Sequence, residues 1–172
     1  VELAPKYYAG YLGLGYLNLL VLNDTKTAMV YFDNALKLRP LYPVINGALG
    51  KYYFFTQEYN KSIEFFDKAI ELDTQAHQAI YSDFMISKGF ALIQIGSYPE
   101  AVELFNKALG VDSVRNVNNY EMLSLVGLVT AHIEIGQKVP AEILPRIMKL
   151  QKEAKNKQFP FLAKKFNSCM QN

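Results

Sequence analysis

Residues 28–38 read AMVYFDNALKL, and the same pattern returns as SIEFFDKAIEL at 62–72 and as AVELFNKALGV at 101–111. Each copy has a small residue, an aromatic residue four positions later and an alanine three positions after that. Spacings of four and three put all three side chains on one face of a helix. The small residues allow a second helix to approach closely around the ring. The pattern therefore predicts three similar helices, each packed around one phenylalanine.

A further helical segment and a short break precede each copy. A degenerate fourth unit at 131–147 follows the same plan, with Pro145 in the place of the phenylalanine. Helix, break and helix, repeated four times at a period of about 34 residues, predicts an all-α solenoid of antiparallel helix pairs. The four breaks lie at Asn23-Asp24, Gln57-Glu58, Gly96-Ser97 and Gly136.

These units resemble the repeats of the tetratricopeptide repeat proteins. The resemblance covers roughly residues 5–150 and implies a right-handed superhelix of about four repeats plus a C-terminal helix. It is specific for the fold and not for the function, because one fold hosts many unrelated partners. The second unit resembles the family most, through Leu49-Gly50, Tyr53, Tyr59, Ser62, Phe66 and Ala69.

We expect a single repeat domain over residues 1–172. The insert at 75–81 is compatible with a longer first helix in the third unit, whereas the clustered asparagines at 114–120 predict a loop. The opening segment 2–5 looks like the last turn of a preceding repeat, so we expect the chain to be part of a longer array. The repeats are expected at about 6–40, 41–74, 75–113 and 114–157, with a capping helix at 158–172.

Composition excludes several classes of protein. Of the 172 residues, 51% are hydrophobic and 20% charged, which excludes a disordered chain. The net charge of +2 predicts no strong attraction for nucleic acid. The single cysteine, Cys169, cannot form an internal disulfide. The longest apolar run, residues 11–22, falls short of the ~20 residues that span a bilayer. We therefore expect a cytoplasmic protein.

Residues that could carry chemistry are sparse. The two histidines, His77 and His132, are far apart and have no acidic residue or cysteine at a metal-ligand spacing. The cysteine has no histidine near it in the sequence that could activate it as a nucleophile. The sequence therefore predicts no enzyme, no metal site and no cofactor.

The resemblance implies that the first helix of each pair lines a concave groove that binds extended or helical peptides. Carried over unit by unit, it predicts an apolar and aromatic lining with one cation, Lys51. The candidate lining residues are Leu12, Tyr16, Leu20, Val44, Lys51, Phe54, Phe55, Ile86, Phe90, Gln94 and Thr130.

Some family members clamp the acidic C-termini of chaperones with lysine, asparagine and arginine in this groove. Those basic and amide residues are absent here, and Asp83 would repel a carboxylate, so this mode of binding is disfavoured. The corresponding positions hold Leu12, Tyr16, Ala48, Asp83 and Ser87.

The leading hypothesis is a non-catalytic protein–protein interaction module that captures an apolar segment of another protein. Its expected anchors are Tyr16, Phe55 and Phe90, because binding energy concentrates on aromatic residues. An exposed apolar groove needs a cover, and the first alternative is a self-assembly or spacer segment of a larger repeat protein. For any one of these residues, a place in the core between helix pairs is also open.

The second alternative rests on charge. Residues 142–172 hold seven basic and two acidic residues beside an amphipathic apolar pattern. A solvated face on a terminal helix accounts for this. Contact with an anionic membrane, or with nucleic acid, remains the alternative function of this segment.

Overall fold

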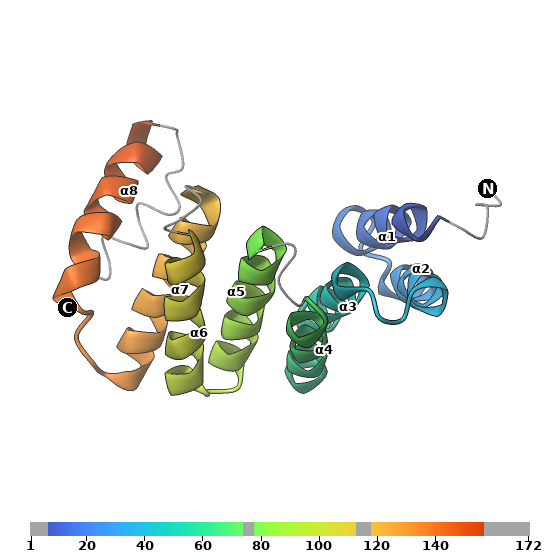
Figure 1. Ribbon diagram of the computed structural model, residues 1–172, viewed down its shortest axis with the longest axis horizontal. Coiled ribbons are helices and arrows are strands. Elements are labelled where there is room, and N and C mark those ends of the chain that lie inside the picture. The colour runs from blue at the N-terminus through green and yellow to red at the C-terminus, as the bar shows by residue number, and fades with distance from the viewer. Residues whose placement is uncertain (1–6, 74–77, 113–117, 157–172) are drawn as a thin grey trace.

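The computed structural model describes residues 7–73, 78–112 and 118–156, and they form a row of helices (Figure 1). No helix in these ranges is both long and apolar enough to cross a membrane. The expected capping helix at 158–172 lies outside the described residues. The α-helices are α1 (Tyr8–Tyr16), α2 (Thr25–Leu38), α3 (Pro43–Phe55), α4 (Tyr59–Leu72), α5 (Gln78–Gln94), α6 (Tyr98–Asp112), α7 (Asn118–Ile135) and α8 (Leu144–Asn156).

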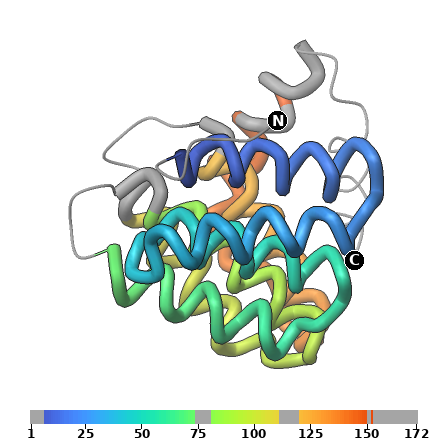
Figure 2. Tube along the Cα trace, turned by 90° about the vertical axis from the view of Figure 1, so that its right-hand side faces the viewer, coloured from blue at the N-terminus to red at the C-terminus, as the bar shows by residue number. Residues whose placement is uncertain are grey.

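The helices pair in chain order, α1 with α2, α3 with α4, α5 with α6 and α7 with α8. We call these pairs units one to four. Figure 1 shows them following one another along the long axis, and the helix direction turns from α1, which lies across the view, to α5–α7, which stand upright. Figure 2, seen from the N-terminal end, shows α1 and α2 as an antiparallel pair with the later units behind them. The all-α solenoid expected from the sequence is confirmed.

The repeated phenylalanine packs the second helix against the first in each of the first three units. Phe32, Phe66 and Phe105 are fully buried, and so are the small residues that flank them. Each ring lies on a glycine of its unit's first helix. A methyl group on that glycine would come within 2.5 to 2.7 Å of the ring, closer than atoms in contact approach. The glycines are Gly15, Gly50 and Gly89.

A residue with positive φ follows each first helix within two residues of its end, counting the π turn as part of the first. Two are glycines, Gly96 at 78° and Gly136 at 74°, but the earlier units place Asn23 at 53° and Gln57 at 64°. This left-handed conformation stops a helix and costs little for glycine or asparagine, and more for glutamine. The four breaks identified in the sequence are therefore one repeated structural device.

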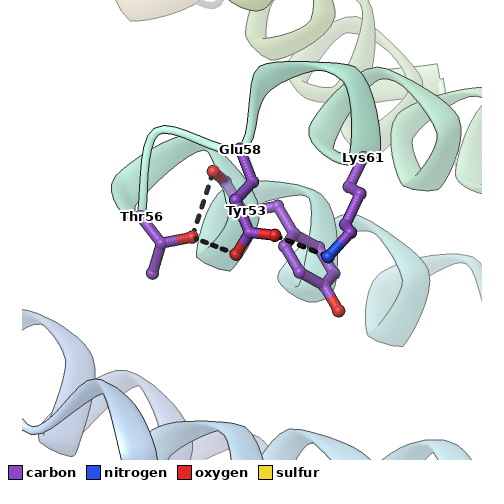
Figure 3. A network of polar contacts seen from close by, with 4 residues as sticks. All are labelled: Tyr53, Thr56, Glu58 and Lys61. Atoms are coloured by element: carbon purple, nitrogen blue, oxygen red, sulfur yellow. Dashed lines mark hydrogen bonds and ion pairs between the residues drawn. The ribbon is translucent and has the colours of Figure 1, made fainter.

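The break after α3 also carries a small polar network (Figure 3). The Thr56 hydroxyl lies 3.3 Å from the Tyr53 carbonyl oxygen and 3.3 Å from Glu58 Oε1. Glu58 Oε2 accepts a hydrogen bond from Lys61 Nζ at 2.5 Å, and the lysine lies over the Tyr53 ring. These contacts connect the end of α3 to the first turn of α4.

Unit one contains one residue more than unit two before its small residue, and a π-helical turn accommodates it. Residues Leu17–Val21 form this turn, in which the Leu22 amide donates to the Leu17 carbonyl oxygen at 3.1 Å. The Asn18 side chain donates to the Leu14 carbonyl oxygen at 2.8 Å. Asp24 then caps α2 by accepting from the Thr27 amide at 3.0 Å.

Unit four starts its second helix differently. Pro140 is followed by a 3-10 turn, Ala141–Ile143, before α8 begins at Leu144. Of the loop expected at 114–120, residues 118–120 are helical instead, because α7 begins at Asn118, and residues 114–117 lie outside the described residues. The asparagines at 118 and 119 thus occupy the first helical turn, where they are better tolerated than in a helix interior.

Candidate partner-binding face

The first helices of successive units form the inner layer of the solenoid. α3 packs directly on α5, and α5 packs directly on α7. Among the described residues the second helices approach one another less closely, and each packs instead on the first helix that follows it. We call the solvent-accessible side of α1, α3, α5 and α7, with the π turn, the inner face.

Most of the predicted groove residues keep some surface on this inner face. Leu20 is 63% exposed and Phe55 is 43% exposed, and Gln94 is exposed as well. The half-buried residues among the prediction are Tyr16, Val44, Lys51, Phe54, Phe90 and Thr130.

Two predicted residues belong to the core instead. Leu12 is 8% exposed and packs in the cluster that joins α1, α2 and α3, whereas Ile86 is 3% exposed and packs with residues of α6 and α7. Leu12 and Ile86 each lie on the flank of a first helix that faces the neighbouring helices, which cover it. This corrects the expectation for Leu12 and Ile86, and we remove both from the candidate face.

Two of the expected anchors are also part of the core's edge. The Tyr16 ring contacts Phe32 edge to face at a centroid distance of 5.3 Å, and Phe90 contacts Phe105 in the same way at 5.2 Å. Phe55 is different, because it is the most exposed of the three. A substitution at Tyr16 or Phe90 would therefore disturb packing as well as the surface.

A charged pair lies on the inner face. Lys51 Nζ of α3 donates to Asp83 Oδ2 of α5 at 2.6 Å. The lysine was expected as the one cation of the groove, and in the structure it has an acidic partner from the next unit. The signal was available in the sequence, since the family frame puts Asp83 in the same groove as Lys51.

Tyr16 completes this polar centre. Burial, with the Asp83 carboxylate as a smaller cause, raises the pKa of Tyr16 from 10.0 to about 12. The hydroxyl is therefore protonated and neutral across the physiological range. It gives the inner face a hydrogen-bond donor without adding a charge.

Two polar side chains of α7 bond to carbonyl oxygens of their own helix. The Thr130 hydroxyl donates to the Val126 carbonyl oxygen at 2.8 Å. His132 is buried, and its Nδ1 lies 2.9 Å from the Leu128 carbonyl oxygen. Across the described ranges, no three histidine, cysteine or acidic side chains gather in a way that could hold a metal ion.

The basic C-terminal part is described only up to residue 156. Arg146 of α8 donates from Nε to Glu121 Oε1 of α7 at 2.8 Å, so this cation ties α8 to the solenoid. Lys149 and Lys152 are exposed. The other basic residues of the predicted attachment segment lie at 155–165, where no side chain is described.

Comparisons with known proteins agree with this architecture. Residues 45–75, most of unit two, match the family model of the tetratricopeptide repeat. A comparison with curated protein sequences found no match.

Several solved structures have a similar fold. The N-terminal domain of stress-induced protein-1 (STI-1) from C. elegans matches with a TM-score of 0.56 and 22% identity, covering 68% of this chain and 96% of that one. YrrB, described as a TPR protein with an unusual peptide-binding site, matches with a TM-score of 0.56 and 14% identity, covering 98% of this chain and 93% of that one. Residues 45–75 thus match a tetratricopeptide repeat, and the chain as a whole has a fold similar to that of these two solved structures.

Proposed function

We propose that the chain is a non-catalytic interaction module that binds a segment of another protein on its inner face. The fold supports the general role of a protein–protein interaction scaffold. The use of the inner face for a peptide rests on one observation. Partly exposed side chains, most of them apolar, recur on all four first helices, while the residues beside them are buried.

The exposed apolar residues of the π turn and of α3 are the most informative to change. Leu20 and Phe55 present large apolar surfaces and are not fully buried in the core. Losing one apolar anchor at an interface costs about 2 kcal/mol or more. We therefore expect Leu20→Asp and Phe55→Asp each to weaken a bound peptide by at least about 30-fold.

The test is selection of binders from a displayed random peptide library, followed by affinity measurement with synthetic peptides. Val30→Asp is the matched control, because Val30 is 58% exposed on the second helix α2. Circular dichroism should show equal helicity for all three variants. A peptide that binds the wild type, Leu20→Asp and Phe55→Asp equally well would contradict the proposal.

Self-assembly is the second candidate, and the exposed apolar residues of Leu17–Leu22 favour it. Leu17, Leu20, Val21 and Leu22 are all exposed within one turn and a half. Analytical ultracentrifugation of the wild type and of Leu20→Asp distinguishes the two functions. A concentration-dependent dimer that Leu20→Asp abolishes would favour assembly.

A further inference from the structure

On α3 and α5 the inner face carries one charged pair among neutral accessible side chains. The side chains of Lys51 and Asp83 remain 38% and 25% exposed, so a bound segment can reach both. On the same faces of α3 and α5, within two turns of the pair, the accessible residues are all neutral: Val44, Phe54, Phe55, Ser87 and Phe90. The pair is thus the electrostatic centre of this surface.

A charged group gains little at such a centre. A carboxylate placed against Lys51 is also within a few ångströms of Asp83, so attraction and repulsion largely offset each other. An ammonium or guanidinium group beside Asp83 meets Lys51 in the same way. Either ion would also lose hydration against the aromatic side chains around it.

A neutral amide fits the pair better. The lysine ammonium has three N–H donors and the carboxylate has about four acceptor positions, of which their mutual bond uses one each. An amide carbonyl oxygen can accept from Lys51 while the amide N–H donates to Asp83. The Tyr16 hydroxyl, whose pKa the Asp83 charge helps to raise, is protonated and adds no charge to this donor and acceptor set.

We propose that the inner face selects an uncharged, apolar segment that places a neutral amide, from asparagine, glutamine or the peptide backbone, on the Lys51–Asp83 pair. This inference rests on the proposed function, since it names the chemistry of the segment bound there. It excludes a C-terminal carboxylate as the central contact. The ion pair then determines which peptide side chains the inner face accepts.

The experiment uses one displayed random peptide library and four forms of the protein: wild type, Asp83→Asn, Lys51→Met and the exchanged double variant Lys51→Asp with Asp83→Lys. The wild type should select apolar peptides with an uncharged residue at the peptide position that lies on the Lys51–Asp83 pair, which we call the contact position. Asp83→Asn leaves the lysine without its counter-charge and should enrich acidic peptides. Lys51→Met should enrich basic peptides, and the double variant should return to the wild-type preference.

Synthetic peptides make the result quantitative. A peptide selected by the wild type is remade with Gln, Glu or Lys at each position in turn. At the contact position, Glu and Lys should each bind the wild type at least about tenfold more weakly than Gln, which corresponds to one hydrogen bond with a charged group. With Asp83→Asn, the Glu peptide should recover most of that loss.

The outcomes separate this inference from the proposed function. Peptides that depend on Phe55 but tolerate Glu and Lys at every position would overturn the inference and leave the proposed function standing. Peptides that ignore both Leu20→Asp and Phe55→Asp would overturn both. A library that yields no peptide dependent on the inner face would also count against both.

Discussion

The sequences of units two and four follow the same repeat pattern, yet different side chains cover the glycine of their first helices. In unit two, Phe66 of α4 packs on Gly50 of α3, and the buried Ser62 hydroxyl donates to the Gly50 carbonyl oxygen at 2.8 Å. In unit four the corresponding place holds Pro145, which is exposed. Gly127 of α7 is covered instead by Phe105, which belongs to unit three.

The difference depends on one aromatic position. Where the second helix has a phenylalanine, that ring covers the first helix of its own unit, and where it does not, the ring of the preceding unit covers it. Phe105 lies between Gly89 and Gly127 and therefore joins α5, α6 and α7 into one core. The 3-10 turn adds Ile143 to that core, and α8 adds Ile147 and the Arg146–Glu121 ion pair at its surface. In unit two, Gly50 of the first helix is covered by the second helix of the same unit, whereas Gly127 of α7 is covered by the unit before it. Phe84 of α5 packs on Gly47 of α3 and joins unit two to unit three.

The largest expected effect comes from truncating the shared ring. Phe105→Ala should destabilise the protein by about 3–5 kcal/mol, because a fully buried phenylalanine is lost and a cavity remains. Phe66→Ala should cost less, since its ring lies on one glycine, Gly50, whereas the Phe105 ring lies on two. Urea denaturation followed by circular dichroism measures both. Equal losses would show that Phe105 does not join two units.

Adding a methyl group on the other side of the same contact should have the next largest effect. Gly127→Ala forces the Phe105 ring to move and should cost about 1–3 kcal/mol. Gly110→Ala on α6 is the matched control, because no atom lies within 4 Å of the added methyl group and alanine favours a helix. In thermal unfolding, the melting temperature of Gly110→Ala should lie above that of the wild type, and that of Gly127→Ala should lie below it.

Units two and three are connected by charge as well as by packing. Lys88 of α5, only 11% exposed, pairs with Asp67 of α4 at 2.8 Å and with Glu100 of α6 at 3.1 Å. Burial lowers the pKa of Lys88, but the hydrogen bonds to Asp67 and Glu100 raise it by more, so the net pKa lies above 10.5. The two carboxylates are about half exposed, and Lys88→Met should therefore cost only about 1 kcal/mol.

The pKa shift sets the pH range of this contribution. A folded-state pKa above the unfolded value gives stability that is complete below the unfolded pKa and is lost as pH rises through the folded one. The stability difference between wild type and Lys88→Met should thus be constant near neutral pH and shrink above about pH 10.5. A difference that shrinks between pH 6 and 8 would contradict this assignment.

The smallest effect concerns the breaks. Gln57 adopts a left-handed conformation that glycine holds at the same place in units three and four. Gln57→Gly should stabilise the protein by up to about 1 kcal/mol, because the strain exceeds the added flexibility of glycine. Gly136→Ala should destabilise it by a similar amount. Differential scanning calorimetry of the two variants tests this, and shifts in the same direction would disprove it.

The core of the fold could be predicted from the sequence because it depends on local spacing. The triplets around Phe32, Phe66 and Phe105 identify the buried face of each second helix without knowledge of the neighbours. The breaks could be predicted for the same reason, since Gly96 and Gly136 mark helix ends.

The inner face was harder to predict because it depends on how units pack on one another. Leu12 and Ile86 occupy groove positions in the family frame, but packing against the helices of their own and the next unit buries them. The Lys51–Asp83 pair joins residues 32 positions apart, and no local pattern reports such a contact. The contact between Gly127 and Phe105 of the preceding unit was also not predicted, because it arises only since unit four has no phenylalanine of its own to cover this glycine.

The π turn at Leu17–Val21 has a consequence for how this array tolerates changes in length. Each residue added to an α-helix rotates everything after it by about 100°. Here the additional residue is taken up within one widened turn, and Ala28, Phe32 and Ala35 still face the core as their counterparts do. The helical phase of the array is therefore independent of insertions at this place, so that repeats of unequal length can share a single interior.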